Sequence, residues 1–280
     1  MTLILAATPL GNPGDASTRL KSAIENASII AAEDSRRFHR LCADIEVTFT
    51  GRVLSFFEGN EEERSRELLA ELKNGASVLV VSDAGMPTIS DPGFRLMRDA
   101  IAEGIDVSVI PGPSAVTMAV ALSGLPTDRF SFEGFPPRTA GARLATFEKL
   151  RFEERTMVFF EAPHRLIDSL ADCVNVFGAE RKGAICREMT KRYEETIRGT
   201  MAELATWSNS NEVLGEITIV IAGAATDSAT LTAADMVARV REFEAAGMDR
   251  KAAIATVADE FGISKRLVYA AVVDANKMSQ

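Results

Sequence analysis

The sequence lacks the features on which several protein classes depend. No run approaches the roughly eighteen consecutive apolar residues of a membrane-spanning helix, so we expect no membrane segment. The N-terminal segment lacks the basic start and long apolar stretch of a secretory signal. The three cysteines, Cys42, Cys173 and Cys186, follow neither disulfide nor zinc spacing. These absences predict a cytoplasmic protein with reduced thiols and no metal site.

A net positive charge and the common phosphate-binding motifs are also missing. A formal net charge of −9 argues against a protein coated in nucleic-acid-binding surface. Local basic clusters remain possible, because phosphate contacts need only a few Arg and Lys side chains. The first glycine-rich loop, residues 8–15, matches neither GxGxxG nor GxxxxGK(S/T). The sequence therefore gives no motif evidence for Rossmann dinucleotide binding or for P-loop nucleotide chemistry.

What the first part of the chain does contain is an alternation of short apolar runs and helical patterns. The apolar runs are 3–7, 28–32, 53–57, 77–81 and 106–110. Helical patterns separate them, notably at 17–26, 61–74 and 93–103. Continuous apolar strands between helices are typical of a parallel sheet covered on both faces. We therefore predict an α/β domain over residues 1–113.

The pattern changes after Pro111-Gly112-Pro113. A helix over 114–122 precedes strand candidates at 130–135, 156–160, 183–188, 194–200 and 216–222. Fewer helices separate these strands, which predicts a mixed, partly antiparallel sheet in a second α/β domain over 114–225. Small residues at 223–230 predict a linker.

The C-terminal segment, residues 229–280, is expected to form a small helical domain. Two helices, 249–261 and 265–274, flank a turn made by Gly262, Ile263 and an N-cap Ser264. This spacing is that of a helix-turn-helix unit, which often binds nucleic acid. A helical hairpin that only docks on the protein stays an alternative.

Three clusters of turn residues, at 8–15, 82–93 and 111–115, follow predicted strands. Ligands of parallel α/β sheets bind at the carboxyl ends of strands. Gly and Pro also mark turns that bind nothing, so a purely structural role stays open for each cluster. Three clusters together, rich in small residues, favour a ligand that lies close to the main chain. They predict a site for a nucleoside-like cofactor.

These segments resemble the tetrapyrrole methylase superfamily, and more narrowly its branch that modifies small-subunit ribosomal RNA. The likeness covers almost the whole chain in order. It is carried by TPLGN (8–12), AAEDSR (31–36), SDAGMPTISDPG (82–93), SGLP (123–126), FEGF (132–135), EAPHR (161–165) and REMTK (187–191).

The resemblance implies a fold, a cofactor and a substrate. The fold is the two-domain tetrapyrrole-methylase fold, with S-adenosylmethionine between a parallel and a mixed-sheet α/β domain. The reaction is transfer of its methyl group to the ribose 2'-hydroxyl of a cytidine in the decoding centre of 16S rRNA, within the small ribosomal subunit, by a homodimer. The implied cofactor contacts are Leu10, Ser82, Asp83, Met86, Ser114, Ala115, Glu161 and Ala162.

Methyl transfer to a hydroxyl needs an aligned acceptor and removal of its weakly acidic proton. The catalytic candidates are Glu33, Asp34 and Lys191, with Asp91 and His164 also chemically able to act. A structural salt bridge is an equal alternative for Asp34. The identity of the base is left open.

RNA phosphates need cations, and the chain offers several beside the predicted cleft. The candidates are Arg36, Arg37, Arg138, Arg143, His164 and Arg187, with Lys265 and Arg266 in the C-terminal segment. Phe38 and Phe135 either stack on an unstacked base or belong to the core. Each basic cluster is also compatible with an ordinary solvated face.

Two other functions stay open at this point. One is methylation of a tetrapyrrole of the precorrin type or of diphthine. The other is a nucleic-acid-binding regulator that keeps the fold without catalysis.

Overall fold

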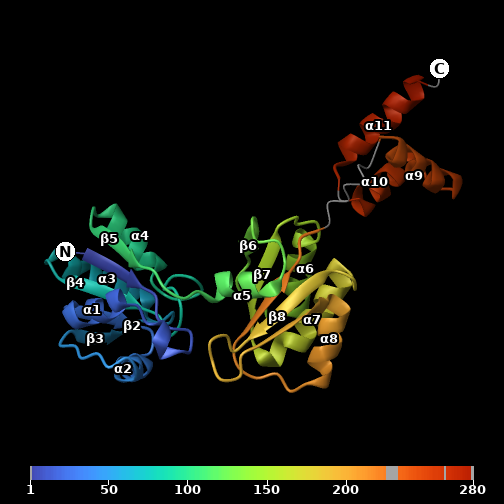
Figure 1. Cartoon of the computed structure of the whole chain (residues 1–280). Helices are drawn as coiled ribbons and strands as arrows, with labels where there is room; N and C mark the ends of the chain where they lie inside the picture. Colours follow the sequence, from blue (N-terminus) through green and yellow to red (C-terminus); the bar gives the residue numbers. More distant parts are fainter. Residues whose placement is uncertain (1, 225–232, 262, 279–280) are drawn as a thin grey trace. The chain divides into compact units, whose positions relative to one another are not determined.

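The computed structural model describes residues 2–224, 233–261 and 263–278, which form two compact units (Figure 1). The larger unit runs to residue 222, without 152–154, and contains two five-stranded sheets. The smaller unit takes in 152–154 and the chain from 223 onward, and it is helical from residue 233. No helix among the described residues is long and apolar enough to cross a membrane.

The first sheet is entirely parallel, as its continuous apolar runs predict. Its strands lie in the order β3-β2-β4-β1-β5. The strands are β1 (Thr2–Ala6), β2 (Ile29–Ala32), β3 (Arg52–Ser55), β4 (Ser77–Val81) and β5 (Asp106–Ile110). The helices are α1 (Thr18–Asn26), α2 (Ser35–Asp44), α3 (Glu61–Lys73) and α4 (Phe94–Ala102), with the 3-10 turn η1 (Pro13–Asp15).

Helices cover both faces of this sheet. Leu5 of β1 packs with Leu68 of α3 and Leu96 of α4 in one hydrophobic cluster. The next residue of the strand, Ala6, points to the opposite face and packs with Phe38 of α2 in another cluster. Phe38 is therefore a core residue and is not available to stack on a base. The loops at the strand ends remain free to build a site.

The second sheet is mixed, as predicted. Its order is β6-β7-β10-β8-β9, with β6 parallel to β7 and the other pairs antiparallel. The strands are β6 (Phe130–Phe132), β7 (Thr156–Glu161), β8 (Lys182–Arg187), β9 (Glu195–Thr200) and β10 (Ile217–Ile221). The helices are α5 (Ala115–Ser123), α6 (Ala140–Leu150), α7 (Leu166–Phe177) and α8 (Met201–Ser210), with the 3-10 turn η2 (Pro163–Arg165).

Within residues 2–224, three helices separate the strands of this sheet and four separate those of the first, so the expectation of fewer helices is confirmed. None of the three was predicted by its residue range. Helices α6, α7 and α8 bury their apolar side chains in one large cluster on one face, and α5 covers the other face. Two signals in the sequence mark the missed helices. Apolar residues recur at helical spacing from Leu166 to Phe177. Thr200 and Glu203 form a capping box at the start of α8.

The smaller unit has its own core. Helices α9 (Ala233–Ala245), α10 (Arg250–Glu260) and α11 (Lys265–Met278) pack around Val240, Val257 and Val268. The two helices of the expected helix-turn-helix are thus present, and the Ser264 hydroxyl accepts a hydrogen bond from the Leu267 N–H at 3.3 Å. Gly262 and linker residues 225–230 lie outside the described residues. The domain bounds 1–113, 114–225 and 229–280 stay a prediction.

Candidate functional site

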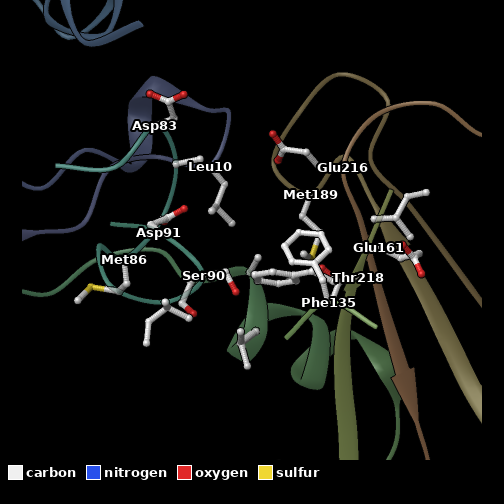
Figure 2. Close-up of a pocket in the computed structure, with 18 of the residues that line it drawn as sticks. Leu10, Asp83, Met86, Ser90, Asp91, Phe135, Glu161, Met189, Glu216 and Thr218 are labelled. Atoms are coloured by element: carbon white, nitrogen blue, oxygen red, sulfur yellow. The ribbon is translucent and has the colours of Figure 1, made fainter. Parts of the chain in front are cut away.

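A cavity of about 500 Å³ lies in the larger unit, at the ends of strands from both sheets (Figure 2). This volume falls in the range of small-molecule sites. Leu10 lies on the loop after β1, and the loop after β4 contributes several further residues. Residues near the ends of β2, β5, β6, β7, β8 and β10 form the rest of the wall.

Two backbone loops are joined directly beneath this cavity. Thr8 and Gly85 exchange N–H···O hydrogen bonds of 2.9 and 3.1 Å, which ties the loop after β1 to the loop after β4. Gly85 has φ +79°, and a Cβ there would lie 3.2 Å from the Leu10 side chain. Ser82 is buried, and its hydroxyl donates to the Gly85 carbonyl at 3.1 Å. Ser82 therefore shapes the loop and does not line the cavity.

Strained backbone flanks the cavity on both walls. Thr88 and Ser90 have φ of +75° and +64°, on either side of Ile89. Glu188 and Thr190 have φ of +50° and +66°, on either side of Met189. Both Ile89 and Met189 line the cavity. Non-glycine residues in this region of φ and ψ cost about 1–3 kcal/mol each and are concentrated at functional sites.

Glu33 and Asp83 meet where the neighbouring parallel strands β2 and β4 end. The Asp83 N–H donates to the Glu33 carboxylate at 3.1 Å, and the Asp34 N–H donates to the Asp83 carboxylate at 3.0 Å. Arg37 lies 3.2 Å from the other Asp83 oxygen. Burial raises the pKa of both Glu33 and Asp83, although these hydrogen bonds oppose the rise.

Asp91 is the most perturbed carboxyl group of the cavity. Burial, reinforced by the negative charges of Glu33 and Asp83, raises the pKa of Asp91 from 3.8 to about 7. Glu216 faces the same space from the other wall and adds a smaller effect of the same sign (Figure 2). Near neutral pH this side chain exchanges a proton readily, which suits a general base.

Lys191 and Asp34, two of the three catalytic candidates, have other tasks. The Lys191 ammonium lies 3.0 Å from Glu188 and 3.1 Å from Glu216. Burial alone would lower its pKa, but these two partners outweigh it and raise the pKa, so Lys191 stays protonated. Asp34 accepts the Arg36 N–H at 2.8 Å as the N-cap of α2. Hydrogen bonds from Arg36 lower the pKa of Asp34, which makes it a poor base.

The structure brings most of the predicted cofactor contacts together. Those that line the cavity are Leu10, Asp83, Met86, Ser114, Ala115, Glu161 and Ala162. Contact with a cofactor stays a prediction for each of them. Among the described residues, no group of three or more His, Cys, Asp or Glu side chains is arranged to hold a metal ion.

Some of the residues predicted to bind RNA are exposed, and others form ion pairs within the protein. Those with exposed side chains are Arg36, Arg37, Arg138, His164, Lys265 and Arg266. Arg187 pairs with Glu195 across the β8–β9 ladder at 2.7 Å. Arg143 is 4% exposed and its Nε lies 2.6 Å from Asp172 on α7, so it cannot reach a phosphate. The prediction for Arg143 is therefore wrong.

Several cavity residues do not figure among the main sequence candidates. Met189, Glu216 and Thr218 come from the second sheet, far along the chain from the glycine-rich loops. Met189 directly follows the predicted strand 183–188 and Glu216 begins the predicted strand 216–222, which is a usable signal for these two. Phe135, expected either to stack or to lie in the core, is 54% exposed and lines the cavity.

Comparisons with known proteins agree with this architecture. The model of the tetrapyrrole (corrin/porphyrin) methylases matches residues 2–205. A Mycobacterium tuberculosis protein named ribosomal RNA small subunit methyltransferase I is 48% identical over 98% of this chain and 95% of its own length. A protein of the same name from Pseudomonas aeruginosa is 40% identical, with 96% and 95% covered. The structure of Thermus thermophilus uroporphyrin-III C-methyltransferase complexed with S-adenyl homocysteine is similar in fold, with TM-score 0.54, 17% identity, and 79% and 96% covered.

Proposed function

Because the chain belongs to the tetrapyrrole methylase family, and within it to the proteins named ribosomal RNA small subunit methyltransferase I, we propose that it methylates 16S rRNA with S-adenosylmethionine. The relatives' names supply the rRNA substrate. The finer proposal, that the acceptor is the ribose 2'-hydroxyl of a cytidine in the decoding centre, is what the family resemblance of the sequence motifs implies. The acceptor would be met in the cytoplasm, within the small ribosomal subunit.

One observation carries the cofactor part of this proposal: carboxylates and apolar side chains share the same cavity. Glu33, Asp83 and Asp91 lie near Leu10 and Met86 on loops of the first sheet (Figure 2). Clustered carboxylates favour a cationic ligand such as a sulfonium, and apolar side chains favour an adenine ring. The residues present therefore fit S-adenosylmethionine, which supplies an activated methyl group when bound.

Asp83→Asn tests this assignment. The variant keeps an oxygen to accept the Asp34 N–H but loses a negative charge. We expect affinity for S-adenosylmethionine to fall by about tenfold more than affinity for neutral S-adenosylhomocysteine, because only the former is a cation. Calorimetry with both ligands measures the difference, and rRNA affinity should change little. The control is Asp99→Asn on α4, outside the cavity. Equal losses for the two ligands would refute the charge argument.

The remaining chemical task, removal of the hydroxyl proton, is assigned to Asp91. Glu33 is held by the Asp83 N–H, Asp34 caps a helix, and Lys191 remains protonated. Asp91 lines the cavity and has a pKa near the pH of the reaction. In this role Asp91 accepts the proton of the acceptor hydroxyl while the cavity walls hold that hydroxyl in line with the methyl group.

The exposed cations next to the cavity serve the RNA backbone in this proposal. Arg37 lines the cavity with its side chain 65% exposed, and Arg36 lies beside it on α2. In the smaller unit, Lys265 and Arg266 begin α11 and are exposed. We assign them to RNA phosphates as well. Unchanged rRNA affinity in a Lys265→Ala, Arg266→Ala double variant would remove that role.

A homodimer is part of the proposal. Phe94 and Ile101 lie seven residues apart on α4, and both are more than half exposed. The neighbouring β5 is an edge strand on which Val109 is 45% exposed. Apolar side chains that cluster beside an unpaired edge favour association with a second copy. A monomeric mass by light scattering at micromolar concentration would contradict it.

A further inference from the structure

One aromatic ring faces the cavity without being buried. Among the described residues that line the cavity, Phe135 and Phe160 are the aromatic ones. Phe160 is half-buried and lies behind Phe135, with ring centroids 5.6 Å apart and planes at 64°. Phe132 supports Phe160 in turn, at 4.8 Å. The exposed ring of Phe135 is thus supported by two further rings in edge-to-face contacts, and it faces the cavity (Figure 2).

The loop that carries this ring is fixed by a buried ion pair. The Arg165 guanidinium donates hydrogen bonds to the carbonyls of Pro136 and Pro137, the two residues after Phe135. Its Nε lies 3.3 Å from Glu161, whose side chain is fully buried. Glu161 also accepts hydrogen bonds from the Ser169 hydroxyl and the Ala162 N–H. The ring is therefore held in place before any ligand arrives.

The charge of the cavity limits which part of a nucleotide can enter. Glu33, Asp83, Asp91 and Glu216 all line it. Within the described part of the chain, Arg37 is the one cation that lines the cavity, and it pairs with Asp83. A phosphodiester brought among these carboxylates would be repelled. The uncharged ribose and base would not be repelled. A nucleotide can therefore present its ribose here only with its phosphates left outside, near the exposed arginines.

We propose that Phe135 is the platform on which the base of the acceptor nucleotide stacks after leaving its place in the RNA, and that Arg165 and Glu161 position it. A base that leaves its stack loses its neighbours, and an aromatic side chain restores one stacking partner. This inference rests on the proposed function, since it takes an RNA nucleotide as the acceptor. Toward the base, Arg165 acts only through the loop, and Glu161 acts through its ion pair with Arg165.

The test is steady-state methylation of small ribosomal subunits by Phe135→Ala, Phe135→Trp and Phe130→Ala, with S-adenosylmethionine affinity measured by calorimetry. Phe130→Ala is the matched control, since Phe130 is an exposed ring of β6 that does not line the cavity. We expect Phe135→Ala to raise KM for the subunits by about 5- to 100-fold, the usual loss for one stacked base. Cofactor affinity should not change. Phe135→Trp should retain KM within about threefold.

Arg165→Ala tests the positioning pair. We expect it to raise the same KM, and adding Phe135→Ala to it should cost little more, since both changes remove one platform. Circular dichroism and thermal melts check that the variants fold. If the increases in KM from Arg165→Ala and Phe135→Ala add up in the double variant, or if Arg165→Ala changes kcat alone, Arg165 does not position the ring and is only a structural residue.

The outcomes separate this inference from the proposed function. An active enzyme in which Phe135→Ala leaves KM unchanged would overturn the platform and leave the function intact. Loss of cofactor affinity in Phe135→Ala, equal to its loss of activity, would assign the ring to the adenine of the cofactor and also overturn it. A wild-type protein that methylates no RNA would instead refute the proposed function.

Discussion

Asp91→Asn is expected to lower kcat by about 100-fold or more while raising the stability of the folded protein above neutral pH. The loss of rate follows from the assigned role, because general base catalysis contributes about 10²- to 10⁴-fold. Asparagine has nearly the same shape but cannot take up the hydroxyl proton. Cofactor affinity should fall less than kcat, since Glu33 and Asp83 keep their charges.

The gain in stability follows from the direction of the pKa shift. In the unfolded chain the Asp91 carboxyl loses its proton near pH 3.8, whereas in the folded protein its pKa is about 7. Between these values the folded state binds more protons, so the stability of the wild type falls as pH rises. The asparagine of the variant does not titrate, so the variant does not lose this stability as pH rises. We expect a gain of about 1–2 kcal/mol at pH 8, after allowing for screening by solvent, and none below about pH 4.

Two measurements check this prediction. Urea unfolding at pH 4, 6 and 8 measures the gain in free energy of unfolding, with Asp99→Asn as the control. In the wild type, kcat/KM for the cofactor should rise with pH toward a plateau above pH 7. This profile follows the pKa of about 7 that Asp91 has in the free protein. A variant with wild-type kcat would contradict the assignment.

Arg143→Ala is expected to lower the free energy of unfolding by about 3–5 kcal/mol without changing rRNA affinity. The guanidinium is buried between α6 and α7 and pairs with Asp172, whose side chain is 18% exposed. Removing one partner of a buried pair leaves the other charge uncompensated, which is costly. Urea denaturation measures the loss, and filter binding measures rRNA affinity.

Two variants sharpen this test. Arg138→Ala removes an exposed arginine near the start of α6 and should change stability by less than about 0.5 kcal/mol. The double variant Arg143→Ala, Asp172→Ala should lose less than the sum of its single changes, because the uncompensated charge is gone. Weaker rRNA binding by Arg143→Ala with unchanged stability would restore Arg143 as an RNA contact.

The fold could be predicted from the sequence where local pattern decides structure. Strand 77–81 and strand 106–110 appear with their predicted bounds, because short apolar runs between helices have few alternatives in a parallel sheet. In the second sheet, α5 was predicted as a helix over 114–122, whereas α6, α7 and α8 were not predicted. Helix α6 in particular has few large apolar residues, namely Leu144, Phe147 and Leu150, and its place is set by packing on α7.

The site could be predicted only in part, because the sequence shows which side chains carry a charge but not which groups those side chains contact. The glycine-rich loops indicated where the cavity lies, because turn residues that follow an apolar run can be recognised from the sequence alone. Arg143 and Arg138 look alike in sequence, and only packing shows that the first is buried. Likewise the pKa of Asp91 depends on its burial, on Glu33 from another segment of the chain, and on Asp83 near the start of its own loop. No local pattern reveals that Lys191 lies between Glu188 and Glu216.

The most direct test of the proposed function offers labelled S-adenosylmethionine together with assembled small ribosomal subunits, naked rRNA or a precorrin as acceptors, in parallel reactions. We predict that label enters the rRNA, at a nucleotide whose 3' linkage resists alkaline cleavage because its 2'-oxygen carries the methyl group. The Asp91→Asn variant should transfer about 100-fold less label under the same conditions. Label on the precorrin alone, or on no acceptor, would contradict the proposal.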